Sequence, residues 1–325
     1  MGMPIRMLSF MALMAVAAPA VSAADADKAW PDRTVRIVTG SAGGPPDAVA
    51  RTLADDFAKR WKKSVIVENR PGADFIIAVR GLLEAQDGHT LLFAPQGVLT
   101  VNPLLHGTLP YDPERDFAPI SLAVEDFLCV AAAPSLGVNS LSELVKLAAA
   151  KPGELNVYVP LGSPHLAWLA FQKRAGISTT FVPYKAPTAA LMDLSAGRIH
   201  VAVMPFAVVR GQAEAGAVKV LAVTNAVRAE AALEIPTVAE AGYPDLTLGG
   251  LLGLFGPKDM PPALQERIAS QVRDILKEPE VRKRLISLGL RSIGTTPAEF
   301  RSVLDEERAK WADFARAHDI KPKRQ

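Results

Sequence analysis

The segment T-V-R-I-V-T-G-S-A-G-G-P-P-D, residues 34–47, sets the fold class. Its first six residues show the apolar alternation of a strand, and the glycine-rich turn at 40–44 follows directly. After Asp47, apolar side chains recur every fourth residue at Val49, Leu53, Phe57 and Trp61, which predicts one face of a helix. A strand, a tight turn and a helix in this order form the repeating unit of an α/β protein.

The rest of the chain repeats this order. Further strands are expected at 64–67, 90–94, 155–159, 181–183, 199–203, 218–224 and 249–256. Helices are expected at 140–150, 164–175, 188–194, 212–215, 262–277 and 297–317. Capping boxes begin at Ser140, Thr237 and Thr296, each with glutamate three residues later. The alternation predicts parallel sheets with helices on both faces.

The spacing of these elements predicts two domains. Residues 24–123 together with 224–325 form a discontinuous first domain, and residues 124–223 form the second. The chain is expected to cross between them at 120–124 and at 222–226.

The N-terminus has the pattern of a secretory signal peptide. Arg6 is the only early charge, an apolar run covers 7–18, and Val21 and Ala23 fit the small residues before a cleavage site. The apolar run is too short for a comfortable membrane span. We therefore expect residues 1–23 to be removed near Ala23 and the mature chain to reach the periplasm.

Composition argues against several function classes. The formal net charge is +2, and no basic stripe is interleaved with aromatic residues, so nucleic-acid binding is not expected. The five histidines do not share helix turns, and the chain has one cysteine, Cys129, so no metal site or cofactor is predicted. Cys129 fits a small buried hydrophobic residue.

The glycine turn does not match a nucleotide loop. G-S-A-G-G-P lacks the G-x-G-x-x-G spacing, and no Lys-Ser/Thr pair follows it. Ser163 and His165 lie two residues apart, but no G-x-S-x-G elbow surrounds them, so a hydrolase is the weaker hypothesis. The sequence favours binding over catalysis, and we expect no enzyme activity.

Four loops carry glycine, serine or proline after a strand and before a helix. They are at 39–47, 94–97, 161–165 and 184–188. Loops at the carboxyl ends of parallel strands converge on one crevice, and helix N-termini there favour anions. An anionic ligand between two domains is the resulting prediction.

Several longer motifs resemble a known family. They include G-G-P-P-D-A-V-A-R from Gly43, V-E-N-R-P-G-A from Val67, L-P-Y-D-P-E-R-D-F-A-P-I-S-L from Leu109 and I-P-T-V-A-E-A-G from Ile235. From Trp30 to Lys321 the chain is similar to the Bug-type periplasmic receptors of tripartite tricarboxylate transporters. The resemblance implies an α/β, two-domain periplasmic binding protein of the Venus-flytrap kind, type II-like, with two crossover strands. It also implies a small organic acid as ligand and the membrane permease subunits as partners; we expect a monomer.

The resemblance also implies the ligand site. Backbone N–H groups of the first loop would hold a carboxylate, and Asp47 would cap the helix behind it. Where the family has polar residues, this chain has Pro187, Met204 and Phe206, which predicts a ligand with one carboxylate and an apolar or aromatic body. The predicted site residues are Ser41, Ala42, Gly43, Gly44, Asp47, Gln96, Gly97, Gly162, Ser163, His165, Pro187, Thr188, Met204 and Phe206.

An alternative of another class stays open. A periplasmic sensor or co-receptor of the same fold would bind the same kind of ligand but signal to a membrane partner. Neighbouring genes would distinguish the two, since a permease supports transport and a histidine kinase supports sensing.

Overall fold

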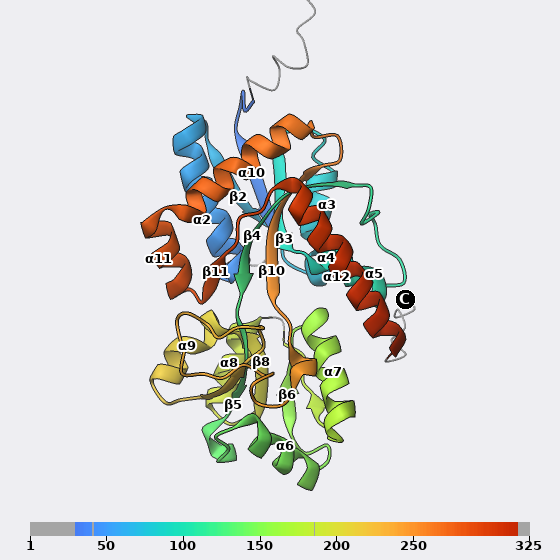
Figure 1. Cartoon of the computed structure of the whole chain (residues 1–325), viewed down its shortest axis with the longest axis vertical. Helices are drawn as coiled ribbons and strands as arrows, with labels where there is room; N and C mark the ends of the chain where they lie inside the picture. The colour runs from blue at the N-terminus through green and yellow to red at the C-terminus, as the bar shows by residue number, and fades with distance from the viewer. Residues whose placement is uncertain (1–29, 41, 185, 318–325) are drawn as a thin grey trace, which may run out of the picture. The chain divides into compact units, whose positions relative to one another are not determined.

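A computed structural model describes residues 30–40, 42–184 and 186–317 of the 325 (Figure 1). From Pro31 onward, the described residues belong to one compact unit that contains two sheets. The predicted signal peptide at 1–23 lies outside the described residues. Within those ranges, no helix has both the length and the apolar character needed to cross a bilayer.

The first sheet has six strands in the order β11-β4-β10-β3-β1-β2. Their bounds are β1 Val35–Thr39, β2 Val65–Asn69, β3 Thr90–Pro95, β4 Phe117–Asp126, β10 Gly250–Pro257 and β11 Leu290–Ser292. The helices of this part are α2 Pro45–Trp61, α3 Ile76–Leu83, α4 Gly97–Thr100, α5 Asn102–Leu105, α10 Pro262–Lys277, α11 Pro279–Ser287 and α12 Pro297–Ala317. We call this sheet and its helices the first lobe.

The second sheet has five strands in the order β7-β6-β8-β5-β9. The strands are β5 Leu128–Ala132, β6 Asn156–Tyr158, β7 Thr180–Phe181, β8 Val201–Pro205 and β9 Lys219–Val223. The helices are α6 Leu141–Ala150, α7 Ser163–Ala175, α8 Pro187–Ser195 and α9 Phe206–Glu214. Short 3-10 turns lie at Ala73–Phe75, Pro134–Leu136 and Pro244–Leu246. This sheet with α6–α9 is the second lobe.

The sheets are mixed, which corrects the expectation of parallel pairing. β1 pairs in parallel with β2 and β3, but β10 runs antiparallel to β3 and β4, and β5 runs antiparallel to β8 and β9. β5 and β10 each follow a passage of the chain from one sheet to the other. They therefore do not arrive through a strand–helix–strand crossover, which is the connection that makes neighbouring strands parallel. β4 stays in the first sheet through Asp126, so the first passage is at Phe127, beyond the predicted 120–124.

Two further elements differ from expectation. α9 begins at Phe206, directly after β8, and includes most of the short helix predicted at 212–215. At Thr237 both reciprocal hydrogen bonds of a capping box form with Glu240, yet a turn follows in place of a helix. The box at Thr296 does open α12, and Ser140 accepts a hydrogen bond from Glu143 N at the start of α6.

Apolar burial on both faces of the second sheet holds this lobe together. Val130 and Val203 point into a core with α6 and α7, whereas Cys129 and Met204 point into a second core with α8 and α9. Side chains of a strand alternate between faces, so neighbouring residues belong to different cores. Both faces are therefore apolar, as is typical of a sheet covered by helices.

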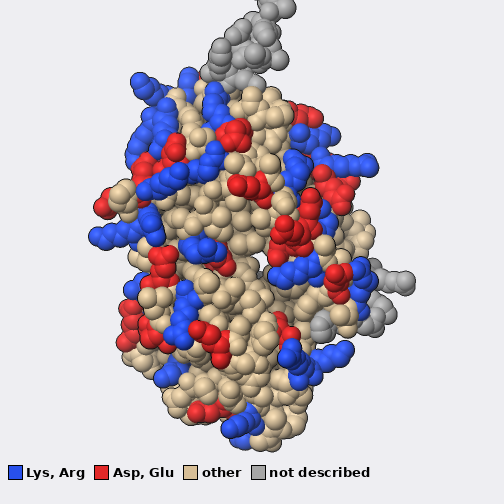
Figure 2. Space-filling model, viewed as in Figure 1, with Lys and Arg blue, Asp and Glu red and all other residues tan. Residues whose placement is uncertain are grey.

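Charged side chains of both signs are interspersed over the face shown in Figure 2. Many form local pairs, such as Arg80 with Glu84 and Arg210 with Glu214, four residues apart on a helix. Exposed pairs of this kind each contribute at most about 1 kcal/mol, so the apolar cores carry most of the stability.

Candidate functional site

The first loop joins β1 to α2 and is anchored by Asp47. Gly44 is the N-cap of α2, and Pro45 is its first residue, so Asp47 is the third helical residue. The predicted N-cap role of Asp47 is therefore wrong. Its carboxylate instead reaches back across the loop and accepts a hydrogen bond of 3.0 Å from the backbone N–H of Gly43.

Two side chains outside the predicted site hold Asp47 in place. Arg51 Nε donates to Asp47 Oδ2 at 3.1 Å, and Asn69 Nδ2 donates to Oδ1 at 2.8 Å. Burial by itself would raise the pKa of Asp47, but the hydrogen bonds from Arg51, Gly43 and Asn69 outweigh it and hold this pKa below its usual value. Asn69 Nδ2 also donates to Gly40 O at 3.2 Å, so both ends of the loop are tied to one amide.

This bracing decides which loop N–H groups remain for a ligand. Gly43 has φ +80°, and its N–H is committed to Asp47. Ser41 lies outside the described residues. Among the described residues, the N–H groups of Ala42 and Gly44 have no hydrogen-bond partner in the chain and lie at the N-terminus of α2, where an anion is favoured.

The second loop places Gln96 inside the first lobe. Gln96 is 3% exposed, its Nε2 donates to Glu307 Oε2 at 3.2 Å, and its Oε1 accepts from Thr100 Oγ1. Its backbone N–H donates to Leu251 O at 2.9 Å. The side chain therefore holds the loop against α12, while Gly97 begins α4 beside it.

The third and fourth loops begin helices of the second lobe. Gly162 is the N-cap of α7 at φ +92°, Ser163 is its first residue, and the His165 ring packs edge-on against Phe181 at 4.8 Å between ring centroids. Pro187 begins α8, and Thr188 follows it as an exposed residue. Both loops place a helix N-terminus after a strand, as predicted.

Met204 does not line an apolar wall, which corrects the prediction. Its side chain is fully buried in the core that β8 forms with α8 and α9, because the alternation along β8 turns it to the face of the sheet that these two helices cover. Phe206 is 3% exposed and belongs to the same core. A β-carbon at Gly289 would lie 3.1 Å from the Phe206 ring, so this ring also packs against the segment before β11.

The comparisons with known proteins decide the family. The sequence model of the tripartite tricarboxylate transporter family receptor matches residues 49–319. The chain belongs to this receptor family. The BugT protein of Bordetella pertussis (strain Tohama I) is 29% identical to this receptor and aligns with 97% of it and 96% of BugT.

Solved structures of similar proteins include two with bound acids. R. palustris Rpa4515 with adipate is 30% identical, with a TM-score of 0.85 over 90% of this chain and 100% of that one. MatC from Rhodopseudomonas palustris with bound malate is 27% identical, with a TM-score of 0.79 over 88% of this chain and 99% of that one. The periplasmic binding protein BugD is 25% identical, with a TM-score of 0.81 over 90% of this chain and 100% of that one. Membership of the receptor family implies a periplasmic location for this receptor.

A polar cluster at the passage between the lobes was not predicted. Glu125 accepts a hydrogen bond from Asn225 Nδ2 at 2.7 Å and one from Arg291 Nε at 2.8 Å. Asn225 Nδ2 also donates to Asp126 O, and its Oδ1 accepts from Leu128 N. The cluster thus ties both segments of the chain that pass between the lobes, near Phe127 and at Asn225, to Arg291 in β11. The spacing of its members, up to 166 residues, leaves no local pattern that could have revealed it.

Asp126 differs from the other side chains of this cluster in its hydrogen bonding. Among the described residues, its Oδ1 has no hydrogen-bond partner. Complete burial, with a smaller contribution from the Glu125 charge, raises its pKa well above the usual value. The close packing extends to β10, since a β-carbon at Gly250 would lie 2.9 Å from Asp126 Cβ.

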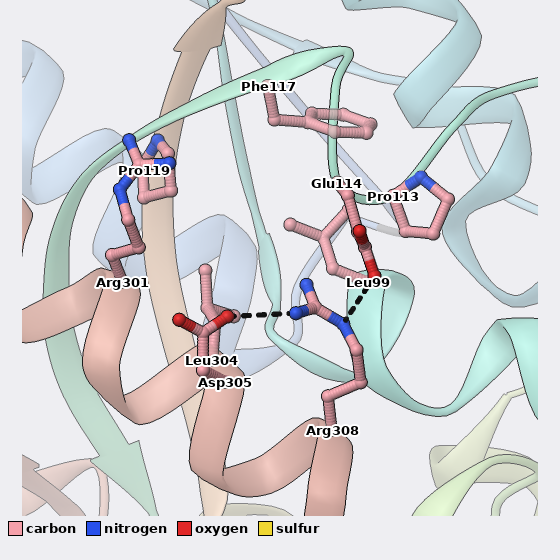
Figure 3. Close-up of a pocket in the computed structure, with 9 residues that line it drawn as sticks. All are labelled: Leu99, Pro113, Glu114, Phe117, Pro119, Arg301, Leu304, Asp305 and Arg308. Atoms are coloured by element: carbon pink, nitrogen blue, oxygen red, sulfur yellow. Dashed lines mark hydrogen bonds and ion pairs between the residues drawn. The ribbon is translucent and has the colours of Figure 1, made fainter. Parts of the chain in front are cut away.

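A surface hollow of about 210 Å³ lies elsewhere in the first lobe, between α12 and the segment before β4 (Figure 3). Arg308 lies across it and pairs with Asp305 at 2.8 Å and Glu114 at 3.8 Å. None of the predicted ligand residues lines this hollow. Because two carboxylates already match the Arg308 guanidinium, this guanidinium is not free to hold an anionic ligand.

Proposed function

We propose that this protein is a periplasmic receptor that captures a small organic acid between its two lobes and delivers it to the membrane permease of a tripartite transporter. The observation that carries the proposal is the likeness to Rpa4515, solved with adipate, over nine-tenths of this chain. The proposal includes cleavage of a signal peptide near Ala23, a monomeric receptor, and two domains as predicted, with the first boundary moved from 123/124 to Phe127.

The first loop supports a carboxylate-binding role. Two backbone N–H groups, of Ala42 and Gly44, stand at the start of α2 on a loop that Asp47 and Asn69 brace. A preorganised pair of donors loses little entropy when an anion binds. We propose that these groups, with Ser41, hold one carboxylate of the ligand.

The second-lobe loops support an apolar ligand body. Their described candidates are Gly162, Ser163, His165, Pro187 and Thr188, and none of these described residues is lysine or arginine; Lys185 of the fourth loop lies outside the described residues. A second carboxylate buried among such groups would lack a charged partner at a cost of several kcal/mol. We propose a ligand with one carboxylate and an aliphatic or aromatic body.

A thermal-shift panel tests both parts. At ligand concentrations about 100 times Kd, the melting temperature should rise by roughly 5 °C. Hexanoate and benzoate represent monoacids, adipate and malate diacids, and citrate a triacid. A rise with citrate and none with the monoacids would contradict the apolar body. No rise with any acid would contradict the receptor proposal.

Binding without catalysis is part of the proposal. The purified protein should return each acid chemically unchanged, and Ser163→Ala should leave that result as it is. Turnover abolished by Ser163→Ala or His165→Ala would support the hydrolase hypothesis instead. The sensor alternative shares the ligand step and differs in the membrane partner.

A further inference from the structure

A small apolar cluster joins the two lobes on the side of α7 and α12 (Figure 1). Its buried members are Val101 between α4 and α5, Leu166 on α7 and Trp311 on α12. Leu104, Leu105 and Phe314 pack around them. Val101 and Trp311 belong to the first lobe, whereas Leu166 belongs to the second.

Leu166 differs from its neighbours on α7. Ala167, Trp168 and Phe171 are buried in the core of the second lobe, but Leu166 is 1% exposed through its contact with first-lobe residues. Separation of α7 from α12 would expose Leu166 and Trp311 to water together. Exposure of apolar surface is unfavourable, so this contact stabilises the arrangement in which the lobes meet.

A polar bridge connects the cluster to the second loop. Glu307 Oε2 accepts a hydrogen bond of 2.9 Å from Trp311 Nε1 and one of 3.2 Å from Gln96 Nε2. One carboxylate oxygen thereby fixes both the indole ring and the loop that contains Gly97. Leu166 follows Ser163 and His165 by at most one helical turn, so the third loop lies beside the same contact.

We propose that Trp311 and Glu307 are positioning residues for ligand binding. In this proposal the packing of Leu166 within the cluster that contains Val101 and Trp311 holds the closed arrangement of the lobes. Glu307 sets the indole and the Gln96 loop in the geometry that this arrangement needs. A ligand that bridges the loops then dissociates only when this contact opens. The inference rests on the proposed function, because it assigns a ligand to the same loops.

The test compares Leu166→Ala with Leu169→Ala, a matched change at a 42% exposed leucine of the same helix. Leu166→Ala should bind about tenfold more weakly, mainly through faster dissociation, and the control should bind as the wild type does. Trp311→Phe keeps an apolar ring but loses the indole donor, and Glu307→Gln weakens the bridge. Both should raise the dissociation rate by a smaller factor. Adipate and benzoate serve as probes, by calorimetry and stopped-flow fluorescence.

Small-angle scattering supplies a readout that does not need a ligand. In the free protein, Leu166→Ala should have a larger radius of gyration than the wild type and Leu169→Ala, with an unchanged circular dichroism spectrum. A wild-type radius and a wild-type dissociation rate in Leu166→Ala would overturn the inference. If the wild type binds neither acid nor any other acid of the panel, the proposed function fails, and the scattering comparison alone then decides this inference. Trp311→Phe repeats the comparison should Leu166→Ala not fold.

Discussion

The carboxylate of Asp47 and the backbone N–H of Gly43 are joined by a hydrogen bond of 3.0 Å that closes the loop between β1 and α2. The same carboxylate also meets Arg51 and Asn69, so its removal would leave three donors without their acceptor. Asp47→Ala should lower the free energy of unfolding by about 2–3 kcal/mol and weaken acid binding, because hydrogen bonds to charged groups each contribute about 1.5–3 kcal/mol. Urea unfolding and calorimetry measure the two effects.

Asp55 provides the matched control on the same helix. It is exposed on α2 and makes no hydrogen bond or ion pair among the described residues. Asp55→Ala should change the free energy of unfolding by less than about 0.5 kcal/mol and leave binding as it is. Equal effects of the two substitutions would contradict the bracing role of Asp47.

The N–H of Gly44 gives a second prediction, on the ligand rather than on the fold. Gly44 has φ −94°, which alanine adopts without strain and proline approaches. Gly44→Pro removes the N–H, whereas Gly44→Ala keeps it. The probe is an acid that raises the melting temperature of the wild type. The proline variant should bind this acid at least about tenfold more weakly than the wild type does, and the alanine variant should bind it within about twofold of the wild-type affinity. Equal affinities of the two variants, by calorimetry, would exclude this N–H as a ligand donor.

The parts of the fold that local pattern determines were predictable. The β1–turn–α2 unit was found because strand alternation, glycine and helical spacing all lie within 28 residues, 34–61. The burial of Cys129 was predicted for the same local reason. Burial, and to a smaller extent the Asp126 charge, raises the pKa of its thiol.

The parts that depend on distant residues were not predictable from one sequence. β8 is apolar on both faces, so its composition does not reveal which residues face a ligand, and Met204 was placed on the wrong side. Asn225 and Asp126 meet across 99 residues of chain, and no spacing rule connects them. The capping box at Thr237 shows the reverse case, because its hydrogen bonds form but no helix follows them.

Asp126 gives a prediction with a defined pH dependence. Its pKa in the folded protein lies well above the value of about 3.9 expected when unfolded. The folded state therefore binds more protons in the interval between these values, and stability falls as the pH rises through it. Asp126→Asn removes this titration, so the variant should match the wild type near pH 4. At pH 8 it should be more stable by at least about 1 kcal/mol.

Asp47→Asn should show the opposite dependence of stability on pH. In the wild type the pKa of Asp47 is lowered by folding. The stability that Asp47 contributes is therefore present above its unfolded pKa and is lost as the pH falls through its folded pKa. The deficit of Asp47→Asn should thus be full at pH 7 and shrink in acid. Urea titrations at pH 2.5, 4, 6 and 8 separate the two behaviours, because the Asp47 deficit shrinks only below about pH 4. A constant difference between Asp126→Asn and wild type over this range would contradict the buried, raised Asp126.

The last prediction concerns Gly253 in β10, where the strand passes under α12. A β-carbon there would clash with Phe300 Cζ and lie 3.2 Å from Ser121 O, and Phe300 is itself fully buried. Gly253→Ala must therefore displace the ring or the strand, and should lower the free energy of unfolding by about 1–3 kcal/mol. Gly211 in α9 has open space around the same position, so Gly211→Ala should raise stability by up to about 1 kcal/mol through helix propensity. Opposite signs in urea unfolding are expected, because alanine fills empty space at one glycine and meets a packed ring at the other.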